Sequence, residues 1–269
     1  MSKCSSVQWA GPTFCIALSG LTIFLLWSEG GMAASSKSSQ GLFPDLRMVV
    51  PQHLQIVNSH QRETLRFSNG IANTGEGPWR MRPVFPVDGL STQDAVQEIL
   101  DKDGNIVLEK VVSQFQFHPE HNHWHIGNVA LFEVRVGSLS GPIFGGNSRK
   151  TTFCLIDWYK LEGNSPTTER TYFECNSAYQ GISPGWVDQY HQSTEGQDLD
   201  VTGAPPGIYF LISTANPDGI FLEKDLSNNT AWLKFDLRRD SNGNGFRLLF
   251  NLLHRSRRFF LQFHHQCDN

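Results

Sequence analysis

Histidines gather in one short stretch of the chain, Phe117–Ile126, which reads FHPEHNHWHI. Four of the ten histidines fall within it, and His121, His123 and His125 occupy alternate positions. An extended strand directs every second side chain to one face, so these three imidazoles could converge on a single ion. His118 lies three residues before His121 and does not share this alternation. The pattern therefore predicts a metal site with three histidine ligands.

Three imidazoles without nearby thiolates favour a reactive metal over a structural zinc site, because coordination positions stay open. Neutral imidazole suits copper, zinc, nickel and iron, so the spacing alone does not separate copper from zinc. A cluster of packed or solvated histidines that binds no metal is the alternative interpretation. The stretch by itself predicts only an open, reactive metal site.

The segments that must position these residues have the patterns of strands. A turn at Asp103-Gly104-Asn105 separates two strand-like runs in VQEILDKDGNIVLEKVV, which predicts a hairpin. Further strands are expected at LRFSNGIANTG, NVALFEVRV, KTTFCLID, GIYFLISTA and TAWLKFDL, and a short helix or turn at QGISPGWVDQY. Residues 44–237 show no long helical period. We therefore expect an all-β fold, an antiparallel β-sandwich with long loops and little helix.

Composition and charge narrow the class of protein. The chain has 269 residues, 39% hydrophobic and 18% charged, which is typical of a globular protein and long enough for a substantial core. The net charge is -4, the pI is near 6.2, and no stripe of Lys and Arg alternates with aromatic residues before the C-terminal tail. Nucleic acid is therefore not an expected partner.

The N-terminal sequence has the pattern of a secretion signal. Residues 1–34 combine Lys3, the apolar run PTFCIALSGLTIFLLW and the small residues GMAASS, which predicts a cleaved signal peptide. An uncleaved anchor is the alternative, although the run is shorter than the roughly 20 residues of a spanning helix. We expect a secreted, extracellular protein, or a periplasmic one in a bacterium, without a membrane span after cleavage. Residues 35–43 then form a linker, 44–239 one domain and 240–269 a tail of unknown structure.

Secretion changes how the cysteines are interpreted. Cys154, Cys175 and Cys267 remain after the signal is removed. In an oxidising compartment we expect a disulfide between Cys154 and Cys175, with Cys267 unpaired. Three reduced, buried thiols would be expected instead if the chain were cytosolic.

Several motifs resemble one known family in the same order. HPEHNHWH resembles the copper-binding signature of the lysyl oxidases, and the match continues through RKTTFCLID, CNSAYQGISPGWVDQY, PPGIYFLISTANP and EKDLSNN. The resemblance covers most of residues 44–237. It implies that the domain at 44–239 is a lysyl oxidase-like catalytic domain, in a compact form without N-terminal accessory modules.

The resemblance also implies roles for particular residues. The three alternating histidines match the copper ligands, and Lys150 and Tyr190 match the lysine and tyrosine that form a lysine tyrosylquinone cofactor. His118 and Asp188 are candidate proton carriers. The implied activity is copper-dependent oxidation of primary amines, with peptidyl-lysine among the candidate substrates, by dioxygen to aldehydes, hydrogen peroxide and ammonia. Without the resemblance, Lys150 would be interpreted as a surface lysine and Tyr190 as a core aromatic.

A second group of residues carries hard oxygen donors, which suit calcium. In lysyl oxidase-like enzymes a calcium site has this pattern, and here it corresponds to Glu223, Asp225, Asn228 and Asn229 together with Asp45 and Leu46, the last through its backbone carbonyl. We expect this calcium to join the two ends of the domain. A solvated acidic turn is the alternative, and Asn228 also begins an N-glycosylation sequon.

The resemblance is incomplete. Animal enzymes of the family have cysteines where this chain has Glu120 and Trp186, so much of their disulfide framework is missing, and Cys154 is the nearest partner for Cys175. A peptidyl-lysine specificity need not accompany the cofactor, so the resemblance does not imply one particular amine. Two other functions compete with the amine oxidase: a non-catalytic secreted metal-binding β-sandwich, and a mononuclear metal oxygenase that uses the same histidines.

Overall fold

The computed structural model describes residues 40–249 except residues 85–90, 121, 162, 164–165, 177 and 195, and describes only the backbone of 145–151 and 247–249. The expected signal peptide at 1–34 and residues 250–269 of the expected tail lie outside the described residues. The described residues belong to one compact unit. None of their helices is long and apolar enough to cross a membrane.

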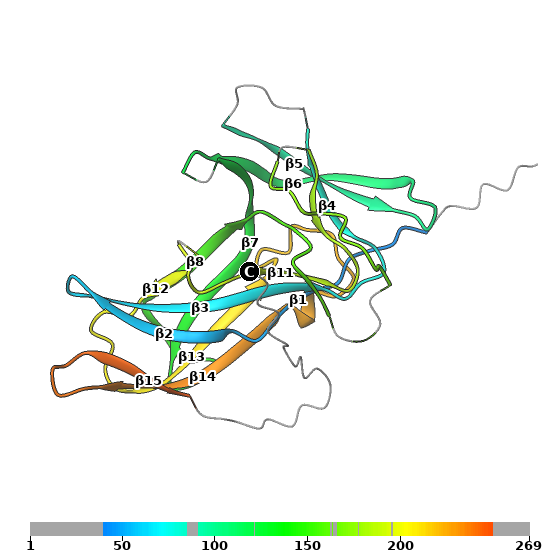
Figure 1. Ribbon diagram of the computed structural model, residues 1–269. Helices are drawn as coiled ribbons and strands as arrows, with labels where there is room; N and C mark the ends of the chain where they lie inside the picture. The colour runs from blue at the N-terminus through cyan, green and yellow to red at the C-terminus, as the bar shows by residue number, and fades with distance from the viewer. Residues whose placement is uncertain are drawn as a thin grey trace, which may run out of the picture. The chain divides into compact units, whose positions relative to one another are not determined.

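Strands dominate the described part of the chain and form two sheets (Figure 1), in which every pairing is antiparallel. The smaller sheet contains β1 (Leu46–Met48), β2 (Gln52–Ser59), β3 (Arg62–Asn73), β9 (Tyr159–Lys160), β11 (Trp186–Tyr190) and β12 (Asp198–Asp200). The larger sheet contains β4 (Trp79–Pro83), β5 (Thr92–Leu100), β6 (Ile106–His118), β7 (His123–Val136), β8 (Ile143–Phe153), β10 (Gln180–Ile182), β13 (Gly207–Ala215), β14 (Thr230–Arg239) and β15 (Gly245–Leu249). The expected all-β, antiparallel fold is confirmed.

Strand β7 is the centre of the larger sheet. It pairs with β6 near its N-terminus and, further along, with β8 on one side and β13 on the other. Through these pairings β7 joins the β4–β5–β6 segment of the sheet to the β13–β14–β15 segment. Figure 1 shows β7 passing between these two groups of strands. The His123–Ile126 end of β7 therefore lies where β6, β7 and β8 meet.

Two turns that the sequence suggested are present. The hairpin between β5 and β6 reverses at Gly104, whose φ of 83° favours glycine, and the Asp101 carboxylate accepts hydrogen bonds from the backbone amides of Asp103 and Asn105. The segment around Pro184 and Gly185 is a turn between β10 and β11 and not a helix. The helical structure of the described residues is one short 3-10 turn, η1 (Leu226–Asn228).

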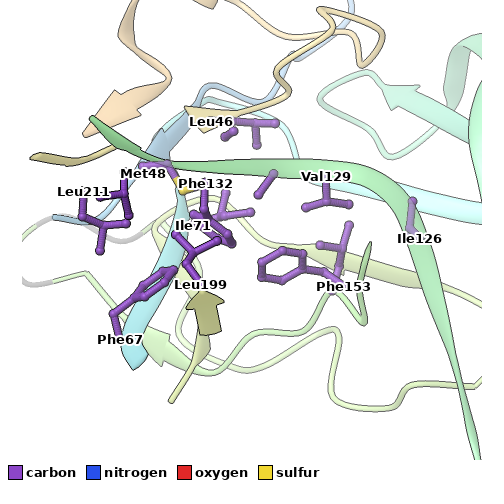
Figure 2. Packing of buried hydrophobic residues seen from close by; sticks show 14 of the residues in the cluster. Leu46, Met48, Phe67, Ile71, Ile126, Val129, Phe132, Phe153, Leu199 and Leu211 are labelled. Atoms are coloured by element: carbon purple, nitrogen blue, oxygen red, sulfur yellow. The ribbon is translucent and has the colours of Figure 1, made fainter. Parts of the chain in front are cut away.

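Large apolar side chains fill the space between the sheets (Figure 2). Phe67 of β3 meets Phe132 of β7 edge to face, with ring centroids 5.1 Å apart, and both side chains are buried. Ile71 and Met48 of the smaller sheet belong to the same cluster of contacts. Alternating apolar residues of strands in both sheets therefore form a single core, as expected for a sandwich.

The ends of the described segment are also integrated in the sheets. Leu42 makes an isolated bridge to Leu100, and its backbone amide donates to the Leu100 carbonyl over 2.7 Å. At the other end, β15 pairs with β14 beyond the residue where the sequence placed the end of the domain. The turn between them is held by the Asp240 carboxylate, which accepts from the backbone amides of Asn242 and Asn244.

Candidate functional site

The hairpin of β6 and β7 presents the histidines. His118 pairs with His123 across the two strands, and Phe117 pairs with Trp124 on the opposite face, where their rings are 5.4 Å apart. The intervening turn needs a left-handed residue, which Asn122 supplies with a φ of 51°. His121, the first predicted ligand, is outside the described residues. Strand alternation thus separates the imidazoles from the apolar face of the hairpin.

His123 and His125 converge as their spacing predicted. Their Nε2 atoms are 2.7 Å apart, and the ring of His118 lies 4.1 Å from that of His125 between centroids. The Nδ1 atom of the buried His125 contacts the Thr152 hydroxyl at 3.0 Å. Two Nε2 atoms that face one another suit ligation of one metal ion, and an outer partner on Nδ1 is the usual companion of a histidine ligand.

A complete metal cluster is not found within the described residues, where no group of three or more His, Cys, Asp or Glu side chains is placed to hold an ion. The expected ligand set has three members, and His121 lies outside that part of the chain. The two described histidines nevertheless fit an imidazole-bound metal through their chemistry and the mutual approach of their Nε2 atoms.

The backbone between the two histidines is held from both sides. The amide of Trp124 donates to the carbonyl of Cys175 over 2.9 Å, and the buried side chain of Gln180 donates to the carbonyl of Trp124 over 2.8 Å. Cys175 is joined to Cys154 by the predicted disulfide, which is therefore confirmed. The histidine strand is thus tied to the segment that follows β8.

The same segment holds Tyr190. The Cys154 amide donates to the Tyr190 hydroxyl over 2.7 Å, and this hydroxyl donates to the Cys154 carbonyl over 3.2 Å. The Tyr190 ring lies edge to face with Phe153, with centroids 4.4 Å apart. Burial, and secondarily the charge of Asp188, raise the pKa of Tyr190 well above its ordinary value. The phenol is therefore fixed in position and kept protonated.

Asp188 lies two residues before Tyr190 in β11 and is buried. Neither of its carboxyl oxygens has a well-formed hydrogen bond to a described residue. Burial, and secondarily the nearby charge of Asp157, raise the pKa of Asp188 well above its ordinary value. Asp157, in contrast, is hydrogen-bonded, because its carboxylate accepts from the backbone amides of Ser183 and Tyr172.

One cavity of about 920 Å³ gathers these groups, and its wall includes His118, His123, His125, Asp188 and Tyr190. Both cysteines of the disulfide also line it, as do the carboxyl-bearing residues Glu120 and Asp198 and the exposed Trp158. Imidazoles, a protonated phenol and a carboxyl of raised pKa therefore share one space with access to solvent. This combination suits metal-assisted redox chemistry on a small polar group.

Lys150 is placed only by its backbone. It lies in β8, opposite Leu131 of β7 and two positions before Thr152, and its side chain is outside the described residues. The predicted pairing of Lys150 with Tyr190 therefore stays a prediction. The fold brings the backbone of β8 alongside the histidine strand.

The residues of the predicted calcium site form a second cluster. The Asn228 side-chain amide donates to Asp45 over 2.9 Å and to Asp225 over 3.2 Å. Glu223 accepts from the Asn229 side-chain amide over 2.8 Å and from the backbone amide of Leu46 over 2.9 Å. The side-chain oxygens of Asn228 and Asn229 are buried and have no hydrogen-bond partner among the described residues.

The pKa values of two carboxyls in this second cluster, Glu223 and Asp45, are shifted in opposite directions. Burial, and secondarily the charge of Asp45, raise the pKa of Glu223 against the effect of its hydrogen bonds. Burial would also raise the pKa of Asp45, but hydrogen bonds from Asn228, Thr74 and Arg47 outweigh it and lower that pKa. Two unsatisfied amide oxygens beside the buried Asp45 and the half-buried Glu223 are a donor set that fits a hard cation.

Sequence reasoning missed the residues that support the site. Thr152 contacts His125, Phe153 packs on Tyr190, and Gln180 holds the backbone between the two described histidines. Thr152 had one available signal, because it stands two positions after Lys150 in a predicted strand. Gln180 had none, because it reaches Trp124 across 56 positions of the sequence.

Comparison with known proteins agrees with this geometry. The lysyl oxidase family model matches residues 100–242. Lysyl oxidase homolog 1 of Homo sapiens is 31% identical over 116 residues, which are 43% of this chain and 19% of that protein. Protein-lysine 6-oxidase of Sus scrofa is 30% identical over 116 residues, 43% of this chain and 44% of that protein.

A longer match, over 177 residues, is to lysyl oxidase homolog 2 of Mus musculus, which is 28% identical over 66% of this chain and 18% of that protein. The matched segments span less than half of the length of these relatives. The family model nevertheless covers more than half of this chain and includes the histidine strand, the disulfide and Tyr190. The chain therefore belongs to the lysyl oxidase family.

Proposed function

We propose that this protein is a secreted, copper-dependent amine oxidase of lysyl oxidase type. The observation that carries the proposal is the convergence of His123, His125, Asp188 and Tyr190 on one cavity in a chain of this family. A non-catalytic metal-binding sandwich would have no need for a buried carboxyl of raised pKa beside a fixed phenol.

The metal would be held by His123 and His125 through their Nε2 atoms, with His121 as the third ligand. The approach of the two Nε2 atoms to 2.7 Å supports this assignment. Copper suits imidazole ligands and supplies, when bound, the redox chemistry needed to oxidise a tyrosine ring and to react with dioxygen. The hydrogen bonds to both sides of Trp124 would keep the ligand strand from shifting.

The organic cofactor would be a lysine tyrosylquinone formed from Lys150 and Tyr190. The Cys154 backbone fixes the Tyr190 hydroxyl, and Phe153 restricts the rotation of its ring. Lysine suits the other half because a desolvated ammonium loses its proton readily and the free amine is a nucleophile. Lys150 lies three residues before Phe153 in β8, and Phe153 contacts the Tyr190 ring, which supports the pairing.

Asp188 and His118 are the candidates for moving protons in the reaction. A carboxyl with a raised pKa, such as that of Asp188, exchanges its proton closer to neutral pH than an ordinary aspartate does. In its ionised form, Asp188 would accept the proton from the carbon next to the amine. His118 borders the same cavity beside His125 and would carry protons between this space and solvent.

The substrate would be a primary amine, with peptidyl-lysine as the leading candidate class. The overall reaction converts R–CH₂–NH₂, O₂ and H₂O to R–CHO, NH₃ and H₂O₂, which balances in atoms and electrons. Glu120 and Asp198 in the cavity wall give it acidic groups that attract an ammonium ion. Trp158 adds an exposed apolar surface for the methylene chain of the substrate.

The second cluster would bind calcium through Asp45, the Leu46 carbonyl, Glu223, Asp225, Asn228 and Asn229. The unpartnered amide oxygens of Asn228 and Asn229 support this assignment, because an ion would satisfy both. A divalent cation would also offset the charges of Asp45 and Glu223, which interact electrostatically. Its role would be structural, since the Asn228–Asp45 contact joins positions 183 residues apart.

Hydrogen peroxide release tests the proposed activity. Copper-loaded protein is incubated with a simple alkylamine or a lysine peptide, and peroxide and aldehyde are measured. We expect both products from the wild type, none from Lys150→Ala, and unchanged yields from Lys102→Ala, which removes an exposed lysine of the β5–β6 turn. Peroxide from Lys150→Ala at the wild-type rate would contradict the role of the quinone. A copper-replete wild type that oxidises none of these amines would favour the non-catalytic alternative.

A further inference from the structure

A side chain of strand β8, that of Thr152, makes a polar contact with a histidine of β7. The Thr152 hydroxyl oxygen lies 3.0 Å from His125 Nδ1, and Thr152 borders the same cavity. His125 is buried, with 8% of its surface exposed, so its ring orientation depends on its protein contacts. The hydroxyl contact therefore lies where it can orient a ligand.

The geometry of the neighbouring strands explains how Thr152 reaches this ring. Ile126 pairs with Phe153 and Ala130 pairs with Thr151. An advance of four residues along β7 therefore corresponds to only two residues of β8. The extra residues of β7 form a bulge, and Asn128 within it has a φ of 59°. Bulges bend a strand and redirect its side chains, and they are frequent beside active sites. The bulge begins two residues after His125.

We propose that Thr152 is the positioning residue for His125, which directs Nε2 of that ring toward the metal. When Nε2 binds a metal, Nδ1 carries the ring proton and donates it in a hydrogen bond to the Thr152 oxygen. This bond selects one tautomer and one ring orientation. In that orientation the Nε2 atoms of His125 and His123 face one another at 2.7 Å.

The position of Thr152 also connects the two halves of the proposed centre. It lies two residues after Lys150 and directly before Phe153, whose ring contacts Tyr190. One short segment of β8 would thus supply the cofactor lysine, the orienting hydroxyl and the ring that packs on the tyrosine. A shift of β8 would disturb the metal ligand and the cofactor residues together.

Copper binding by full-length variants tests this role. Thr152→Val removes the hydroxyl at nearly constant volume, and Thr152→Ser keeps the hydroxyl. Thr214→Val is the matched control, because Thr214 also lies in a strand and its hydroxyl contacts Thr230 at 3.1 Å, away from the histidines. Copper(II) affinity is measured by competition with a chelator, and the copper(II) electron paramagnetic resonance spectrum is recorded for each protein.

We expect Thr152→Val to bind copper about 10- to 100-fold more weakly than the wild type, with a changed hyperfine splitting. Thr152→Ser and Thr214→Val should match the wild type in both readouts. Wild-type affinity together with a wild-type spectrum in Thr152→Val would overturn the proposal. Equal loss in Thr152→Ser would also overturn it, because the hydroxyl is then not the cause.

Folding and the proposed function are controlled separately. Circular dichroism before copper addition shows whether each variant is folded, and if Thr152→Val is not, Thr152→Ala replaces it under the same expectations. The role of Thr152 rests on the proposed copper site, but different results would contradict the role and the site. A wild type that binds no copper would contradict the proposed function, whereas equal binding by wild type and Thr152→Val would contradict only the role of Thr152.

Discussion

The disulfide between Cys154 and Cys175 should contribute strongly to stability, and its removal is a quantitative test of the structure. The two cysteines are separated by 21 positions. A cross-link that closes a loop of this size lowers the entropy of the unfolded chain by an amount worth about 3 kcal/mol at 25 °C. We therefore expect the double variant Cys154→Ala/Cys175→Ala to lose about 3 kcal/mol of unfolding free energy.

Removal of the disulfide should also weaken the proposed copper site, because each cysteine makes a backbone contact there. Cys154 holds the Tyr190 hydroxyl, and the Cys175 carbonyl holds the amide of Trp124 between the two described histidines. Without the cross-link these two contacts are no longer coupled. Copper affinity should therefore fall in the double variant even at temperatures where it remains folded.

Urea unfolding followed by fluorescence measures the first effect, with copper and calcium removed from all samples, since bound ligands add to apparent stability. Cys267→Ser is the control, because it removes the third cysteine of the expected mature chain and leaves the pair intact. A double variant within about 1 kcal/mol of the wild type would refute the reasoning from loop closure. An equal loss in Cys267→Ser would refute the assigned pairing.

Three further perturbations have defined outcomes. Because the folded-state pKa of Asp188 is raised, folded protein keeps this proton while unfolded protein loses it as pH rises above about 4, so stability falls. Asp188→Asn should remove this fall in stability, so the unfolding free energies at pH 4 and pH 7 should differ less than in the wild type. The same variant should not oxidise amines. An unchanged pH dependence of stability would contradict the raised pKa. Glu223→Gln should weaken calcium binding at least tenfold by calorimetry, and wild-type affinity should decrease as pH falls through the raised pKa of Glu223; equal affinity in the variant would contradict the site. Phe67→Ala should cost about 3–5 kcal/mol in urea unfolding, whereas Phe246→Ala, at an exposed position, should cost under about 1 kcal/mol; similar losses would contradict the placement of the core.

Local features of this protein could be predicted from the sequence because short-range periodicity determines them. The alternation of His123 and His125 requires only that the segment be a strand, and the β5–β6 hairpin requires only a turn at Gly104 between two strand-like runs. The all-β class follows from the same alternation. Side chains a few residues apart on a strand have few other arrangements available to them.

Long-range contacts could not be predicted in this way. The Thr152–His125 contact depends on a bulge in β7, and the burial of Asp188 depends on the packing of two sheets. Asp45 and Asn228 were brought together only by the family resemblance, since they lie 183 positions apart. Lys150 and Tyr190 were singled out in the same way. No periodicity in one chain reports which distant strands become neighbours.

The most direct test of the central claim is peptide mass spectrometry of copper-loaded, amine-oxidising protein. After proteolysis, we expect one cross-linked species that joins the peptide containing Lys150 to the peptide containing Tyr190, with the mass of the oxidised, linked pair. The species should be absent from protein expressed without copper and from Lys150→Ala. Recovery of both peptides unlinked and unmodified from copper-replete, active protein would contradict the account.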